Sequence, residues 1–292
     1  MKKLSTVLAG ILIPWAATAH YHCNVAAKSQ AQGTPLYFQN GEDFLTNSGF
    51  VLTLNQTNTH PGYFITSDVN NITFTSTGTG FLEPPADGAQ VWLRIVSVSG
   101  PPGGNFAVWD VSQYFYQDGN GDHFNEDEND ATAVTFTLPT GTVNGTNAIL
   151  LSENFDEPGA SAFGHIHGRM WSADKAGLYV VTVQAYDGGT NGTDGGPIQS
   201  PSGRLQIYFQ AGDQISGVVV GTNEVDISFP AKIGDNPNGT DYYLEASPNP
   251  ADPLSWQTVA GPVLGDDHFH VLSDPNWNAA HRFYRLRLEP AP

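Results

Sequence analysis

The sequence predicts an all-β protein made of two β-sandwiches, a larger one followed by a smaller one. Short runs rich in Val, Ile, Thr, Tyr and Phe alternate with polar residues at the period of two that is typical of strands. Turn-forming residues separate these runs, and the chain contains 32 glycines and 20 prolines, which would interrupt long helices. No segment has a convincing amphipathic helical spacing.

The strand-like runs fall into two groups. The first group covers residues 36–38, 50–54, 91–96, 134–138, 178–183 and 205–209. The second covers residues 224–229, 242–245, 256–259, 268–272 and 283–288. Runs of this length separated by turn residues favour an immunoglobulin-like or jelly-roll-like sandwich. We therefore expect a first domain over residues 20–212 and a small C-terminal module over residues 213–292.

Residues 1–19 have the pattern of a secretory signal peptide. Lys2 and Lys3 precede an apolar run over residues 7–15, and Ala17-Thr18-Ala19 provides the small residues of a cleavage site. The apolar run is shorter than the roughly 20 residues that a membrane helix needs, and no later stretch approaches that length. We expect a secreted chain, periplasmic or extracellular, that begins at His20 and is not inserted in a membrane.

Composition limits the partners. The net charge is −18, and removal of Lys2 and Lys3 would make it two units more negative. Such a surface argues against nucleic acid and anionic membranes and favours cations. The chain has 1 cysteine, so it has no internal disulfide.

The first candidate ligand pair is His165-Ile166-His167. Two residues apart on a strand, both imidazoles project from one face and can converge on one ion. Neutral imidazole is a good ligand for zinc and copper, and ligands from elsewhere would complete a tetrahedral site. The alternative is two polar histidines on a solvated strand face.

Cleavage after Ala19 would leave His20-Tyr21-His22 at the new N-terminus. The free amine, two backbone nitrogens and the His22 imidazole could hold Cu(II) or Ni(II) in a square plane. His20 could instead chelate through its own amine and imidazole, as in copper monooxygenases with a histidine brace. The alternative is a terminus that frays in solvent.

The remaining histidine patterns are weaker. His60 lies in a turn before a strand and could be a further ligand or a loop residue. Residues 118–128 imitate the start of a calcium loop, but His123 and Asn129 stand where that pattern needs Gly and Glu. In His268-Phe269-His270 we expect Phe269 and Val271 to face the core and both histidines to face solvent.

Two resemblances extend this interpretation. Segments Gly164–Trp171, Ala176–Tyr179 and Ser99–Trp109 resemble blocks in exported bacterial proteins that a zinc-responsive regulator represses, related to surface-anchored repeats beside actinobacterial metal-uptake transporters. That family's His-x-Asp block is met here by His22-Cys23-Asn24, so Asn replaces the carboxylate. Residues 243–247, 254–256 and 282–287 resemble an accessory module common on secreted verrucomicrobial proteins. The first resemblance implies metal biology and a metal-uptake transporter as a partner.

Together these patterns predict a secreted protein, not an enzyme, that captures or buffers zinc outside the cytoplasmic membrane when zinc is scarce. No nucleophile elbow, phosphate-binding glycine loop or His-Glu-x-x-His helix is present in the sequence. The predicted ligands are His165 and His167, then His22, with His20 and His60 as weaker candidates. The alternatives are a copper-dependent oxidase with a His20 brace and an adhesive or structural surface module.

Overall fold

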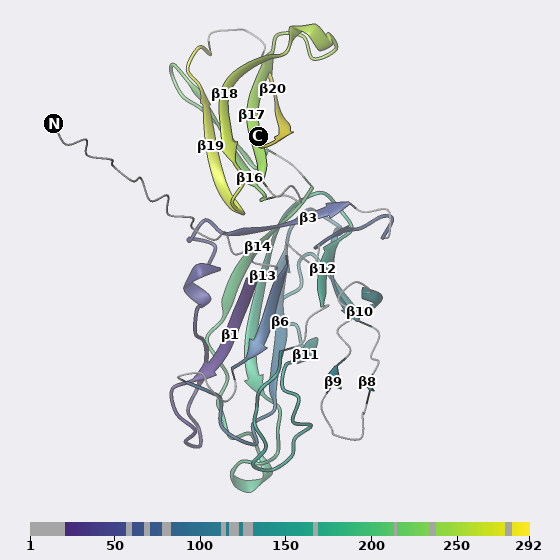
Figure 1. Cartoon of the computed structure of the whole chain (residues 1–292), viewed down its shortest axis with the longest axis vertical. Helices are drawn as coiled ribbons and strands as arrows, with labels where there is room; N and C mark the ends of the chain where they lie inside the picture. The colour runs from purple at the N-terminus through teal and green to yellow at the C-terminus, as the bar shows by residue number, and fades with distance from the viewer. Residues whose placement is uncertain are drawn as a thin grey trace, which may run out of the picture.

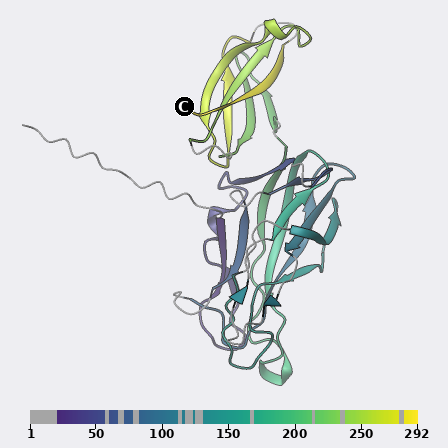
Figure 2. The same cartoon turned by 45° about the vertical axis from the view of Figure 1, so that its right-hand side comes forward.

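The computed structural model is nearly all β-strand, which confirms the all-β, sandwich-like fold predicted from the sequence. Two groups of sheets are stacked end to end along the long axis of the molecule (Figures 1 and 2). The structure describes residues 21–56, 60–66, 71–77, 83–111, 115–116, 123–124, 131–165, 169–212, 215–233, 238–277 and 282–292.

The described residues of the first part form fourteen strands. They are β1 (Tyr21–Ala27), β2 (Leu36–Phe38), β3 (Val51–Gln56), β4 (Phe64–Ile65), β5 (Ile72–Ser76), β6 (Val91–Ser99), β7 (Asn105–Val111), β8 (Phe115–Tyr116), β9 (His123–Phe124), β10 (Ala131–Pro139), β11 (Ala148–Leu150), β12 (Met170–Ala173), β13 (Gly177–Asp187) and β14 (Leu205–Ala211). Two short 3-10 helices, η1 (Gly41–Asp43) and η2 (Thr193–Gly195), lie between them.

These strands form a small sheet, a large sheet and a separate two-stranded ribbon. The small sheet has the order β2-β1-β5, the large one β10-β7-β12-β4-β3-β14-β13-β6-β11, and the ribbon pairs β8 with β9. Most neighbours are antiparallel, but β1 is parallel to β5 and β14 is parallel to β3. The parallel β1–β5 pair carries one of the predicted ligands, His22.

The core of the first part lies between the small and the large sheet. Cys23 and Val25 enter it from β1, and Leu52, Trp171 and Phe209 enter it from the large sheet. All of them are at most 1% exposed. Burial of such apolar surface contributes about 25 cal/mol per Å², and it is the main force that holds the two sheets together.

Two three-stranded sheets are formed by the described residues of the second part. Its strands are β15 (Gly217–Val220), β16 (Val225–Ala231), β17 (Thr240–Ser247), β18 (Gln257–Leu264), β19 (His268–Asp274) and β20 (Phe283–Pro290), with the 3-10 helix η3 (Pro253–Ser255) before β18. The sheet orders are β15-β16-β19 and β18-β17-β20. The expected boundary near residue 213 falls between the last strand of the first part and the first strand of the second.

Strand β19 departs from the prediction at Val271 and His270, whereas the side chain of His268 is 44% exposed as expected. Val271 is 57% exposed, and the His270 ring lies 6.4 Å from the buried Phe229 ring, centroid to centroid. Phe269 packs against Tyr208 of the first part, with ring centroids 5.5 Å apart. The contact with the other part therefore decides which face of β19 is buried. The alternation of apolar and polar residues could not reveal which face of β19 is buried, because both faces of this strand carry ring side chains.

The part of the chain that the structure describes contains no helix long and apolar enough to cross a membrane.

Candidate metal centre

Strand β1 presents His22 on the face opposite the core. Successive side chains of a strand point to opposite sides, and Cys23 and Val25 are fully buried, so His22 and Asn24 point the other way. The Asn40 side chain fixes this stretch, because its Nδ2 donates to the His22 carbonyl oxygen at 2.8 Å and its Oδ1 accepts from the Asn24 N–H at 2.9 Å. The Asn24 Oδ1 in turn accepts from the Thr75 hydroxyl at 2.7 Å.

The segment before His165 docks on the other edge of β5. Thr77 donates its N–H to Val25 of β1 at 2.8 Å, while Ser76 donates to the Gly164 carbonyl at 2.8 Å and accepts the Gly164 N–H at 3.2 Å. Neighbouring residues of a strand direct their backbone groups to opposite edges. Strand β5 therefore lies between β1 on one edge and, on the other, the β-bridge that Ser76 forms with Gly164, here called the Gly164 bridge. It brings the two distant segments into one plane.

Glycine is required at position 164. A Cβ atom there would coincide with the Leu151 carbonyl oxygen, so any other residue would push the segment off β5. The glycine of the Gly164-His165 pair thus has a packing reason, the close approach of two backbones.

His22 and His165 meet through their ring nitrogens. Their Nε2 atoms are 3.3 Å apart, and their ring centroids are 4.6 Å apart with the planes at 72°. Two imidazole ligands of one tetrahedral ion have a similar separation between their nitrogens. A hydrogen bond between two neutral imidazoles, one donating and one accepting, has a similar separation.

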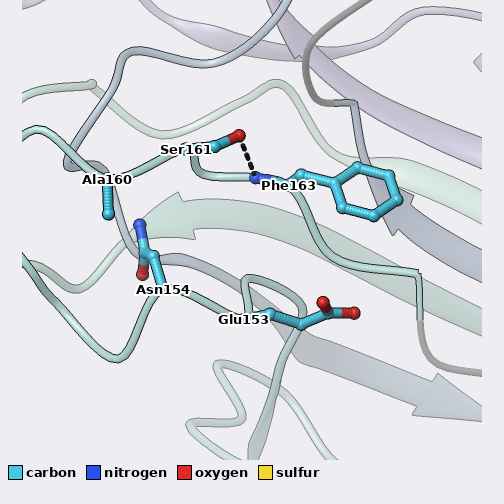
Figure 3. Close-up of a pocket in the computed structure, with 5 residues that line it drawn as sticks. All are labelled: Glu153, Asn154, Ala160, Ser161 and Phe163. Atoms are coloured by element: carbon cyan, nitrogen blue, oxygen red, sulfur yellow. Dashed lines mark hydrogen bonds between the residues drawn. The ribbon is translucent and has the colours of Figure 1, made fainter. Parts of the chain in front are cut away.

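A carboxylate lies beside the pair. Glu153 Oε1 accepts the His165 backbone N–H at 3.1 Å, and the Phe163 ring lies 6.4 Å from the His165 ring, centroid to centroid. Glu153 and Phe163 also line an open pocket of about 330 Å³ together with Asn154, Ala160 and Ser161. Figure 3 shows the Glu153 carboxylate and the Phe163 ring extending to the same side of this pocket.

Two neighbours of His22 on β1 keep their protons. Burial, and secondarily the charge of Asp43, raises the pKa of the Cys23 thiol far above its usual value, and the side chain lies in the core on the face opposite His22. Burial and the neighbouring Asp267 raise the pKa of the Tyr21 hydroxyl, which therefore remains a hydrogen-bond donor.

The structure brings together two of the five predicted ligands, His22 and His165. His20 and His167 lie outside the described residues. Among the residues that are described, no group of three or more His, Cys, Asp or Glu side chains converges on a possible ion. His60 is therefore not part of the pair, and its ring instead packs edge-on against Trp109 with centroids 5.0 Å apart.

The other histidine patterns lie elsewhere. Both His268 Nδ1 and His270 Nε2 contact Asp266, at 2.7 Å from its carbonyl oxygen and 2.8 Å from its carboxylate. The side chain of His123 and most of residues 118–128 lie outside the described part, so the calcium-like loop is not placed.

The sequence blocks around the pair serve mainly to build the core. Trp171 is 1% exposed and donates its indole N–H to the Ile72 carbonyl of β5 at 2.9 Å. Gly100 and Gly104 lie against Tyr179, where added Cβ atoms would fall 2.7 and 2.6 Å from its atoms. Trp171 thus holds β5 in place, the two glycines leave room for Tyr179, and His165 faces the site.

Sequence reasoning missed Asn40 and Glu153. Asn40-Gly41 has the composition of a turn, and nothing in its local pattern shows that the amide holds a strand at His22. Glu153 is one of 29 acidic residues, and only the tertiary structure places it beside His165.

No protein-family model, curated protein or solved structure matches the chain.

Proposed function

We propose that the chain is a metal-binding protein that holds zinc between His22 and His165. The supporting observation is the 3.3 Å separation of the two Nε2 atoms. Zinc binds imidazole nitrogen at about 2.0–2.1 Å, and two such nitrogens at a tetrahedral angle lie about 3.3–3.4 Å apart. Adjacent ligands of a square-planar copper ion lie closer, at about 2.8–2.9 Å.

Further ligands complete the site in this proposal. His167 is two residues from His165 and His20 is two residues from His22 in the sequence, and we propose these two histidines as the further ligands. The Glu153 carboxylate is engaged by the His165 backbone N–H and does not converge on one ion with the rings of His22 and His165. A four-coordinate zinc would take both His167 and His20, or one of them and a water molecule.

The role outside the cytoplasmic membrane rests on the signal-like segment and the acidic surface. A chain with net charge −18 concentrates cations around itself. Capture or buffering of zinc, with transfer to an uptake transporter, needs a site that binds and releases the ion but no catalytic group. We therefore propose binding rather than catalysis.

The deciding experiment is calorimetric titration of the full chain with zinc and with copper. We expect one zinc per chain, and His22→Ala and His165→Ala should each weaken binding by about tenfold or more. His60→Ala is the matched control, since His60 is a half-exposed histidine of the same part whose ring rests on Trp109. The variant that carries both His22→Ala and His165→Ala gives the background heat of the zinc titration. If the wild-type chain gives no more heat than this double variant, the two histidines form only a hydrogen bond, and the proposal is refuted.

A further inference from the structure

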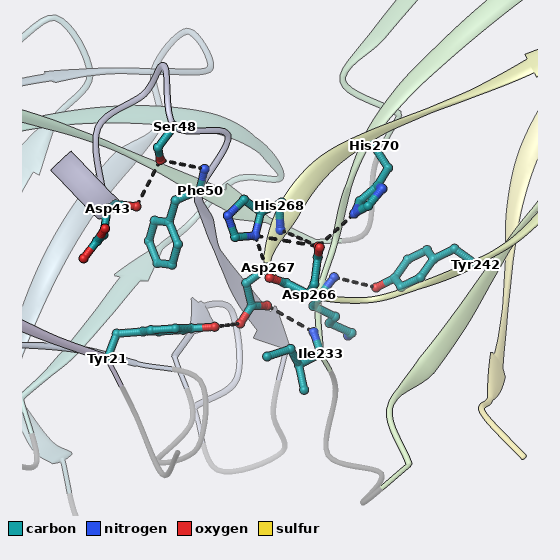
Figure 4. Close-up of polar contacts among 11 residues, drawn as sticks. Tyr21, Asp43, Ser48, Phe50, Ile233, Tyr242, Asp266, Asp267, His268 and His270 are labelled. Atoms are coloured by element: carbon teal, nitrogen blue, oxygen red, sulfur yellow. Dashed lines mark hydrogen bonds and ion pairs between the residues drawn. The ribbon is translucent and has the colours of Figure 1, made fainter. Parts of the chain in front are cut away.

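The two parts of the molecule meet next to the first residue of β1. Figure 4 shows Tyr21 reaching from the first part to Asp267, which lies in the turn before β19 of the second part. The Tyr21 hydroxyl donates to Asp267 Oδ2 at 2.8 Å, and the Ile233 N–H donates to Asp267 Oδ1 at 3.1 Å. Both carboxylate oxygens of Asp267 are therefore engaged, one by each part.

The backbone of Asp267 is held as firmly as its side chain. Its carbonyl accepts the Val51 N–H at 2.9 Å, and its own N–H donates to Ala231 at 2.8 Å. Phe269 donates to the Gly49 carbonyl at 3.0 Å, and Phe50 forms a β-bridge with His268. Asp267 has φ 58°, a left-handed conformation that a non-glycine residue keeps only when its surroundings determine it.

Tyr21 is fixed at three points. Its N–H donates to the Asn71 carbonyl at 2.8 Å, and its ring packs edge-on against Phe50 and Phe44, with centroid distances of 5.1 and 6.3 Å. Asp267 holds the far end of the side chain. Because neighbouring side chains of a strand point to opposite faces, the direction of Tyr21 sets the direction of His22.

We propose that Asp267 of the C-terminal module is a positioning residue for the histidine pair: through Tyr21 it holds the start of β1 and directs His22 toward His165. The functional meaning of this inference rests on the proposed metal site, but its geometry does not. It gives the second part of the chain a role in the site of the first. Asp267 touches neither histidine and acts through the residue beside His22.

The test uses the full chain and zinc ions as the probe. Tyr21→Phe removes the hydroxyl and keeps the ring, and we expect it to weaken zinc binding about fivefold to tenfold. Tyr284→Phe is the matched control, because the Tyr284 hydroxyl donates to the buried Asp274 at 3.0 Å entirely within the second part. It should reduce thermal stability to a similar extent and change zinc affinity less than about twofold.

A double-mutant cycle tests the route from Asp267 to His22. If Asp267 acts through Tyr21, then Asp267→Ala should weaken zinc binding as Tyr21→Phe does, and the double variant should lose little more. When Asp267→Ala is combined with Tyr284→Phe, the change in the free energy of zinc binding should instead equal the sum of the changes that the two single variants cause. Should Asp267→Ala fail to fold, the milder Tyr21→Phe still decides the question.

Histidine ring signals in nuclear magnetic resonance spectra of the metal-free chain separate this inference from the proposed function. Tyr21→Phe should shift the signals of His22 and His165, and Tyr284→Phe should not. If the wild-type chain binds no zinc but Tyr21→Phe still shifts these signals, the proposed function fails and the positioning stands. Unchanged ring signals together with unchanged zinc affinity in Tyr21→Phe would overturn the positioning.

Discussion

The Nε2 atoms of His22 and His165 lie 3.3 Å apart, although 143 residues separate them in the chain. Strand β5 makes this contact possible, since β1 lies on one of its edges and the Gly164 bridge lies on the other. The geometry of the histidine pair thus depends on the backbone pairing of β5 with β1 and with Gly164, which single substitutions can disturb.

Gly164→Ala should weaken zinc binding by about tenfold or more, because the new Cβ would occupy the position of the Leu151 carbonyl oxygen and move His165. We also expect a loss of about 1–3 kcal/mol in the free energy of unfolding, as for other overpacked positions. Calorimetric titration and chemical denaturation measure the two effects. Gly203→Ala is the control, since nothing lies within 4 Å of a Cβ at that position. Equal behaviour of the two variants would contradict the proposed role of the Gly164 bridge.

Zinc affinity should fall steeply with pH. Metal and proton compete for the same imidazole nitrogen, and an ordinary histidine titrates near pH 6.5. With histidine ligands, lowering the pH from about 7.5 to about 5.5 should weaken binding by about tenfold or more. Titrations at both pH values measure this change. An affinity that stays constant would show that acidic side chains, rather than His22 and His165, hold the ion.

Cys23→Ala should leave zinc affinity within about twofold of the wild type. The thiol is fully buried on the core side of β1, and burial raises its pKa, so it acts as a small apolar side chain. The substitution should cost about 1 kcal/mol of stability through lost packing. Loss of zinc binding without loss of stability would instead identify Cys23 as a ligand.

Acid should lower the stability of the second part, because it protonates the carboxylate of Glu245. Its burial alone would raise the pKa of its carboxyl, but the hydrogen bonds and charges of Arg285 and Arg287 outweigh that effect and lower it. A lowered pKa in the folded state adds stability above the unfolded pKa of about 4.3, and this stability is lost as the pH falls through the folded pKa. Glu245→Gln should therefore cost about 1 kcal/mol at neutral pH and close to nothing at about pH 2.5.

Denaturant unfolding at both pH values checks the Glu245 prediction. The control is Glu224→Gln, which changes an exposed carboxylate in the turn before β16. A penalty for Glu245→Gln that persists undiminished in acid would mean that packing, and not charge, explains the role of Glu245.

The sequence by itself determined the all-β class, because alternating apolar residues can form a core only as strands with one buried face. It also identified His22 and His165 as separate candidates, since a histidine is chemically recognisable wherever it stands. The burial of Val271 and the full exposure of His270 were predicted wrongly, because local alternation does not record which other part of the molecule covers a strand.

Only the tertiary structure decided which histidines meet and what holds them. The pairing of β1 with β5, the Asn40 amide on the His22 carbonyl and the Asp267 carboxylate on Tyr21 join segments that are distant in the chain. Such contacts arise from the register between strands and from the packing of one part on the other. A single sequence carries no local signal for either, because its patterns record the faces of each strand but not the partners that those faces meet.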